Sequence, residues 1–248
     1  MPNNYYERID GKKDLIIALG DSWTAGEGCY TDKIIDDYLS KKITQEQAFD
    51  LGRDVFGPDS WPDTLAKLMD CDHINLGWAG GANTAMAKRL IDQNDRDHKG
   101  HYENVYVIFL LSDPTRINFY SGTGLASYNV NTGIDEPIMK AYISSVMKTC
   151  EDADLETIHA LKCIDYYCQA KGYKFFYGSA FYNLNNSFNT LFNLYNQNFH
   201  NFMDYDSMIH LTDAPKLKSR MNCGHPNQKG YKVIAEQMHS IMVDHKWI

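Results

Sequence analysis

Short apolar runs, each ended by glycine or polar residues, recur along the chain and alternate with segments of helical periodicity. Apolar runs of this length are typical of strands that are buried on both faces of a parallel sheet. The strands expected from this pattern are residues 15–19, 73–76, 105–111, 173–179 and 208–211.

Between these runs, apolar residues recur every three or four positions, which predicts amphipathic helices. The expected helices begin near Ser60 and Asn83, extend over residues 136–170, and follow Gly230 at the end of the chain. Asn83 is a suitable N-cap, and Gly172 is a suitable C-cap for the long helix. Thr44 and Gln47 have the spacing of a capping box, which predicts a further short helix.

The alternation of strands and helices predicts an α/β fold: a flavodoxin-like, doubly wound parallel sheet of about five strands with helices on both faces. We expect one domain over residues 1–248, with insertions near 27–59 and 117–153. The first insertion is acidic and polar, and either covers the edge of the sheet or decorates the surface. Residues 117–133 are rich in Gly, Asn, Ser and Tyr without a firm period, which predicts a long loop.

The first predicted strand ends in the turn Gly20-Asp21-Ser22. Ligands of open α/β sheets bind beyond the carboxyl ends of the strands, so Ser22 is expected at the edge where a site forms. A serine in this place is either a nucleophile or a helix cap. His225 lies in the loop before the last helix, which is expected to bring it to the same edge.

Three of these edge loops together resemble the blocks of the SGNH (GDSL) hydrolase family. They are Gly20-Asp21-Ser22, the segment 75–80 ending in Gly80, and His225-Pro226-Asn227 followed by Gly230-Tyr231. The resemblance extends from near residue 14 to near residue 240, and its blocks occur in the family's order.

The resemblance implies a three-layer α/β/α sandwich with Ser22 as the nucleophile and His225 as its base. It also implies an oxyanion hole formed by the backbone N–H groups of Ser22 and Gly80 and a side-chain donor in the third block. A serine hydroxyl needs such a base to attack an ester, and the tetrahedral oxyanion needs preorganised donors.

The chain departs from the family pattern at two positions. The third block carries Ser112 where the family has asparagine, so Ser112 is the candidate donor there, with Arg116 or Asn118 as replacements. Asn222 stands three residues before His225, where the family has aspartate.

Without that aspartate, a backbone carbonyl or another acid such as Asp213 orients His225, or the pair works as a Ser–His dyad. Arg116 and Asn83 are also the candidate substrate-binding residues.

The resulting prediction is a serine esterase or O-deacetylase that acts on a small acyl ester, with carbohydrate-linked esters included, through an acyl-serine intermediate. The alternative is a non-catalytic SGNH-like binding or structural module, which the two departures favour. A flavodoxin-like cofactor or phosphate binder would fit the topology, but the chain has neither a P-loop nor a complete dinucleotide motif.

Composition narrows the range of partners. The net charge of −8 argues against a nucleic-acid partner, and no apolar stretch is long enough to span a bilayer. His98 and His101 lie three positions apart in a polar loop without supporting carboxylates or thiols, so we expect a solvated loop, no metal and no cofactor.

The six cysteines are scattered and are expected to be reduced thiols. Because the first residues lack the pattern of a signal peptide, we expect a cytoplasmic protein, with incorporation into a larger particle left open. The expected partner is a small-molecule or carbohydrate ester, and the sequence does not predict the oligomeric state.

Overall fold

The computed structural model describes residues 6–27, 37, 40–44, 47, 59–93, 98–114, 116–121, 124–129, 150–180 and 225–248. A five-stranded sheet forms the centre of the molecule, in the order β1-β3-β2-β4-β7. Its strands are β1 (Tyr6–Arg8), β2 (Asp14–Gly20), β3 (Asp72–Asn75), β4 (Asn104–Leu111) and β7 (Lys174–Ser179).

The sheet is mostly parallel, as predicted. β2 pairs in parallel with both β3 and β4, so that Ile17 lies opposite Ile74 on one side and Val107 on the other. β4 pairs in parallel with β7. The order β3-β2-β4-β7 matches the first four positions of the flavodoxin-like pattern 2-1-3-4-5, whose ligand site lies where the chain reverses direction across the sheet, here between β2 and β4.

The edge strand β1 was not predicted. It is antiparallel to β3 and contains only Tyr6, Glu7 and Arg8, which is too short and too mixed in polarity to show a period. The strand predicted at residues 208–211 lies outside the described residues.

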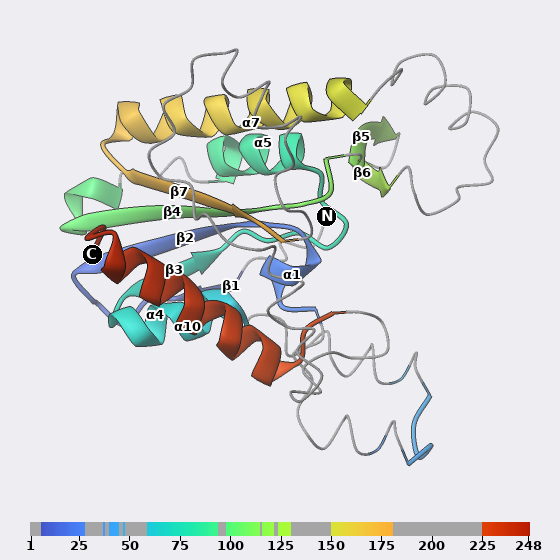
Figure 1. The fold of residues 1–248 in the computed structure, drawn as a ribbon, viewed down its shortest axis with the longest axis horizontal. Helices are drawn as coiled ribbons and strands as arrows, with labels where there is room; N and C mark the ends of the chain where they lie inside the picture. The colour runs from blue at the N-terminus through green and yellow to red at the C-terminus, as the bar shows by residue number, and fades with distance from the viewer. Residues whose placement is uncertain are drawn as a thin grey trace.

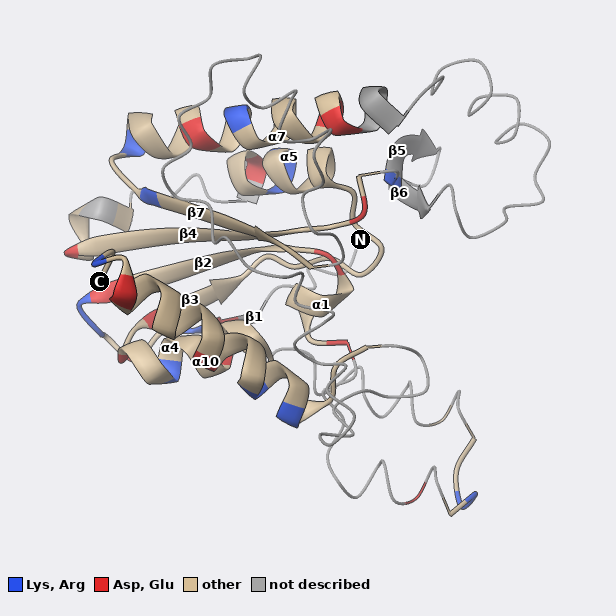
Figure 2. Ribbon diagram, viewed as in Figure 1, with Lys and Arg blue, Asp and Glu red and all other residues tan. Residues whose placement is uncertain are grey.

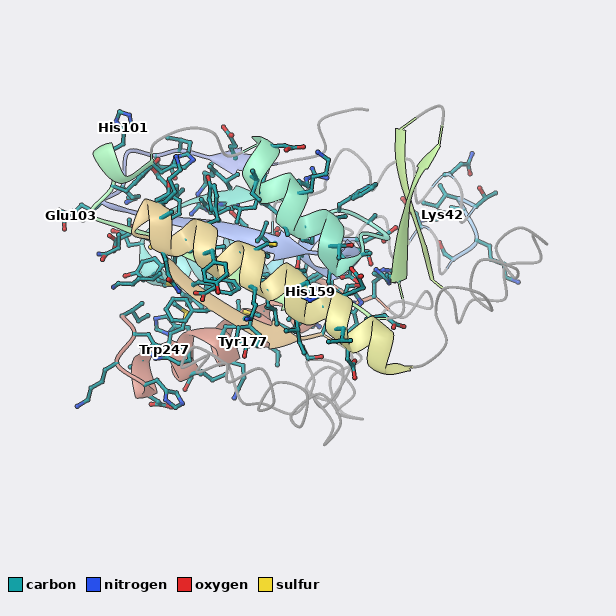
Figure 3. The ribbon with its side chains drawn as sticks, turned by 90° about the horizontal axis from the view of Figure 1, so that it is seen from above. Lys42, His101, Glu103, His159, Tyr177 and Trp247 are labelled. Carbon is teal, nitrogen blue, oxygen red and sulfur yellow. The ribbon has the colours of Figure 1, made fainter. Side chains whose placement is uncertain are left out.

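Helices cover both faces of the sheet, which completes the α/β/α sandwich (Figure 1). α5 and α7 lie side by side on one face, and α4 and α10 lie on the other; Figure 3 shows the first pair from above. The helices are α1 (Ser22–Ala25), α4 (Trp61–Met69), α5 (Asn83–Gln93), α7 (Cys150–Lys171) and α10 (Gln228–Asp244), with a 3₁₀ turn η1 (His98–Gly100).

Alternation along the strands divides the core into two halves. Leu15, Ile17 and Leu19 of β2 pack with residues of α5 and α7, whereas Ile16 and Ala18 pack with residues of α4 and α10. All five are completely buried, which explains why the strand has no polar face in the sequence. Figure 2 shows where the charged residues lie. Acidic and basic residues are spread along the outer helices, while the strands carry charge mainly at their ends.

The helix predictions hold for most of the inward-facing positions. The apolar residues with helical spacing along α10 are all buried, namely Tyr231, Ile234, Met238, Ile241 and Met242. Gly172 ends α7 at a φ of 68°, which is the left-handed conformation of a helix C-cap.

Two apolar residues, whose spacing along α4 and α5 predicts that they lie on the buried stripes, are instead exposed: Leu68 at 44% and Ile91 at 45%. Each lies at the margin of its helix's apolar stripe, where a small rotation turns the side chain toward solvent.

The segment predicted as a long loop contains a β-hairpin. β5 (Arg116–Ser121) and β6 (Gly124–Asn129) pair with each other in a separate two-stranded sheet, which lies beyond one end of the main sheet (Figures 1 and 3). Because these strands do not join the main sheet, no continuous apolar run marks them in the sequence.

Two local predictions have different outcomes. The capping box is confirmed, because the backbone N–H of Thr44 donates to the Gln47 side chain and that of Gln47 donates to the Thr44 hydroxyl. The solvated loop is wrong for His98, which is buried in η1 and donates its backbone N–H to the Tyr173 hydroxyl. In the part of the chain described, no helix combines the length and hydrophobicity needed to cross a membrane.

Candidate active site

The turn after β2 places Ser22 at the carboxyl end of the sheet. Gly20 has a φ of 152°, and a Cβ atom there would lie 2.1 Å from the Thr24 hydroxyl oxygen and 2.8 Å from the Leu110 carbonyl oxygen. Asp21 caps α1 by accepting the Trp23 backbone N–H at 3.0 Å. Glycine and a capping carboxylate therefore let the strand turn directly into the helix that begins with Ser22.

The loop after β3 is fastened to this turn by hydrogen bonds. The Asn75 side chain donates to the Thr24 carbonyl at 2.7 Å and accepts from the Gly77 N–H at 2.9 Å. The Trp78 N–H donates to the Gly20 carbonyl at 2.9 Å. The same loop carries Gly80 at a φ of 74°, with open space where a side chain would be.

His225 reaches Ser22 from the far end of the chain. It precedes α10, whose first turn is capped by the Asn227 side chain through a 3.1 Å hydrogen bond from the Gly230 N–H. The His225 Nε2 atom lies 2.8 Å from the Ser22 Oγ atom, although 203 positions separate the two residues. The structure thus brings the predicted nucleophile and base to hydrogen-bonding distance.

The Asp21 carboxylate, next to Ser22, is hydrogen-bonded to three segments of the chain. Besides the Trp23 N–H, it accepts the Ser112 hydroxyl at 3.2 Å and the Arg116 guanidinium at 2.7 Å. Burial raises the pKa of the Asp21 carboxyl, and the charge of Arg116, followed by the hydrogen bonds from Trp23 and Ser112, opposes that rise. Two candidate residues of the sequence analysis, Ser112 and Arg116, are therefore both bound to this carboxylate.

The Asn83 side chain also forms hydrogen bonds within the protein. Its side chain donates to the Ser112 carbonyl at 3.2 Å and to the Thr157 hydroxyl at 3.0 Å, and accepts the Ser112 N–H at 2.9 Å. Asn83 is the first residue of α5 rather than the residue before it, so its amide joins α5 to the end of β4 and to α7.

Glu27 completes the cluster, and the sequence analysis did not identify it. Its Oε2 atom lies 3.1 Å from the His225 Nε2 atom. Burial alone would raise the pKa of the Glu27 carboxyl, but the hydrogen bond and charge of His225, helped by Ser22 and Arg116, outweigh burial and lower it. The signal in the sequence was an acidic residue directly after Gly26, five residues beyond Ser22.

Other candidates cannot be placed in this site. Asn222 and Asp213 lie outside the described residues, and the side chain of Asn118 is not described. Cys71, Cys163 and Cys168 are free thiols. The described ranges contain no group of three or more His, Cys, Asp or Glu residues arranged to hold a metal ion.

The arrangement can transfer a proton from a hydroxyl to an imidazole at the edge of a parallel sheet, beside the loop that carries Gly80. This is the local chemistry that acyl transfer through a serine requires.

Comparisons with known proteins agree with the observed fold. A family model described as GDSL-like Lipase/Acylhydrolase matches residues 16–238. No curated protein matches the chain.

Two solved structures illustrate the similarity of fold. An acetyl xylan esterase from the rumen bacterium Butyrivibrio proteoclasticus is 12% identical with a TM-score of 0.58, over 96% of this chain and 66% of that protein. A family two carbohydrate esterase from Clostridium thermocellum, in complex with cellohexaose, is 12% identical with a TM-score of 0.53, over 96% of this chain and 66% of that protein.

Proposed function

The chain belongs to the GDSL-like lipase/acylhydrolase family, and on that premise we propose that it hydrolyses a small acyl ester through an acyl-serine intermediate on Ser22. One observation carries the proposal: the Ser22 Oγ and His225 Nε2 atoms lie 2.8 Å apart at the carboxyl edge of the sheet. Ligands of this kind of fold bind at that edge.

In the first half of the reaction, the Ser22 oxygen attacks the acyl carbon while His225 Nε2 takes the hydroxyl proton. The tetrahedral intermediate carries its negative charge on the former carbonyl oxygen, next to the backbone N–H groups of Ser22 and Gly80. As the bond to the alcohol oxygen breaks, His225 gives its proton to that oxygen, and the acyl group stays on Ser22.

In the second half, water attacks the acyl carbon and His225 takes one of its protons. Collapse of the second intermediate breaks the bond to the Ser22 oxygen, which recovers the proton from His225. The products are one alcohol and one carboxylic acid, and the enzyme returns to its starting state.

In this proposal, Ser112 has a structural role. Its hydroxyl and backbone N–H donate to Asp21 and Asn83, so these groups hold the end of β4 against the turn that carries Ser22. The oxyanion hole then depends on the two backbone N–H groups, and Arg116 lies near it with a 3.4 Å contact to the Gly81 carbonyl.

The fold neighbours support one substrate class for this proposal. Similarity to an acetyl xylan esterase and to a carbohydrate esterase bound to cellohexaose supports an acetyl group on a carbohydrate as the ester to be tested first.

The test is Ser22→Ala, assayed with p-nitrophenyl acetate and with acetylated oligosaccharides. Without the nucleophile we expect kcat to fall by at least about a thousandfold, because the histidine has no oxygen left to activate. Ser240→Ala, which removes an exposed hydroxyl from α10, is the matched control and should retain full activity. Equal activity in Ser22→Ala and the unchanged protein would refute the assignment.

The second candidate is a non-catalytic binding module, favoured by the engagement of the Ser112 hydroxyl with Asp21 where the family has an asparagine donor. A fluorophosphonate probe separates the two functions. A catalytic protein is modified at Ser22, as mass mapping would detect, whereas a binding module is not.

A further inference from the structure

Two groups share one nitrogen atom of His225. The Ser22 Oγ atom lies 2.8 Å and the Glu27 Oε2 atom 3.1 Å from Nε2. An acid that orients a catalytic histidine usually binds the other nitrogen, Nδ1, and leaves Nε2 to the serine. Glu27 therefore has a different relation to the histidine from the aspartate that Asn222 replaces.

The backbone of Glu27 is fastened to both halves of the site. Gly26 ends α1 in the left-handed conformation at a φ of 91°, and the Glu27 N–H donates to the Ser22 carbonyl at 2.9 Å. The Glu27 carbonyl accepts the hydroxyl of Tyr231 at 2.6 Å, and Tyr231 is a buried residue of α10, the helix that follows His225. The carboxylate is thus held beside the imidazole by the elements that carry Ser22 and His225.

The His225 Nε2 atom can form a hydrogen bond with only one of its two neighbours, Ser22 or Glu27, at a time. A neutral ring without a proton on Nε2 accepts the Ser22 hydroxyl, which is the reactive arrangement. A ring with a proton on Nε2 donates to the Glu27 carboxylate instead. A negative charge at this distance favours the protonated ring, because opposite charges within about 4–6 Å stabilise each other.

We propose that Glu27 is a positioning residue that sets the pH at which the Ser22–His225 pair becomes reactive, by holding the protonated imidazole through Nε2. The inference rests on the proposed function for its catalytic consequence. The same contact stabilises the imidazolium that forms when Ser22 loses its proton to His225 during attack.

Among the described residues, Asp21 and Arg116 are further charged groups that act on the pair. They form an ion pair at 2.7 Å, so their opposite charges offset each other in part, whereas the Glu27 carboxylate is in direct contact with the ring. The Glu27 and His225 side chains are only 18% and 21% exposed, which limits screening by water and salt.

The experiment compares Glu27→Gln with the unchanged protein in a pH profile of kcat/KM for p-nitrophenyl acetate. Glutamine keeps the size of the side chain and removes its charge, so the neutral imidazole persists to lower pH. We expect the midpoint of the acidic limb to move down by about one pH unit. We expect kcat/KM on the plateau to fall about tenfold, because the imidazolium loses its partner.

Glu236→Gln is the matched control, because it removes the same charge from an exposed pair with Lys232 on α10. Its acidic limb should coincide with that of the unchanged protein. An acidic limb that stays in place in Glu27→Gln, or moves to higher pH, overturns the inference.

A titration of the His225 imidazole by ¹⁵N NMR, assigned with His225→Gln, makes the test independent of turnover. A midpoint that moves to lower pH in Glu27→Gln supports the contact even if no ester is hydrolysed, in which case the proposed function alone has failed. A midpoint that does not move overturns the inference even if the enzyme is fully active.

Discussion

At the scale of single residues, Asp21 is the side chain on which the site is assembled. It is fully buried and accepts donors from α1, from the end of β4 and from the first residue of β5. A buried carboxylate is stable only when paired and hydrogen-bonded, and each of these donors contributes to meeting that requirement. Because Asp21 lies between Gly20 and Ser22, the same hydrogen bonds also hold the proposed nucleophile in place.

Asp21→Asn should therefore destabilise the protein out of proportion to the small change in shape. Asparagine can still accept the Trp23 N–H, but it removes the negative charge that lies 2.7 Å from the Arg116 guanidinium, which is only 13% exposed. We expect a loss of about 3 kcal/mol in the free energy of unfolding, measured by urea titration.

The control is Asp92→Asn, which breaks an exposed pair with Lys88 on α5 and should change the free energy of unfolding by less than about 1 kcal/mol. If Asp21→Asn is no more destabilising than this control, Asp21 does not have the structural role assigned to it.

At the scale of elements, the site depends on the close packing of two loops, those that follow β2 and β3. A Cβ atom on Gly77 would lie 2.3 Å from the Ala25 nitrogen and 2.6 Å from the Thr24 carbonyl carbon. Both are backbone atoms, so a larger residue could be accommodated only by moving α1, and Ser22 with it.

Gly77→Ala should accordingly reduce both activity and stability. Misplacing the nucleophile relative to His225 should lower kcat/KM by about 10- to 100-fold. The strain should lower the free energy of unfolding by about 1–3 kcal/mol. Esterase kinetics and urea unfolding of the same sample measure the two effects.

Gly100→Ala provides the comparison, because a Cβ atom there meets nothing within 4 Å. Gly100 lies in η1, and its replacement should leave both quantities close to those of the unchanged protein. A kcat/KM of Gly77→Ala equal to that of Gly100→Ala would show that the loops tolerate displacement.

At the scale of the whole molecule, the loss of folding stability at low pH should originate in the core rather than at the proposed active site. His73 is completely buried on β3, close to Asp63 and Lys67 of α4 and paired in register with Arg8 of β1. Burial lowers the pKa of His73 to about 4, an effect that Asp63 opposes and that Arg8 and Lys67 reinforce.

The sign of the pH effect follows from this shift. The unfolded chain binds a proton at His73 near the ordinary pKa of 6.5, whereas the folded protein does so only near 4. The stability contributed by the neutral ring is therefore fully present above about pH 6.5 and is lost as the pH falls toward 4.

We expect the free energy of unfolding to fall between pH 7 and pH 4.5 by an amount on the order of 2 kcal/mol more in the unchanged protein than in His73→Gln. Urea titrations at both pH values give this difference, in which other groups that titrate cancel. His101→Gln, which removes an exposed ring (Figure 3), should follow the unchanged protein. Parallel loss of stability in all three proteins would exclude His73 as the source.

The main strands could be predicted because their signal is local. The completely buried residues of β2 and β4 are apolar on both faces, so the run of residues itself reports burial. β1 and the β5–β6 hairpin could not be predicted in this way. The first pairs along one edge with β3, and the second pairs with itself away from the main sheet, so neither needs a continuous apolar run.

The amino-acid sequence was enough to predict the parallel strands β2, β3, β4 and β7, the glycine turns and the positions of Ser22 and His225 next to element ends, because each depends on a few neighbouring residues. Which side chains meet became visible only in the folded molecule: Asp21 with Arg116, Asn83 with Ser112, and Glu27 with His225. Those contacts depend on the order of the strands and on how closely the loops pack, and both are set by residues distant in the chain.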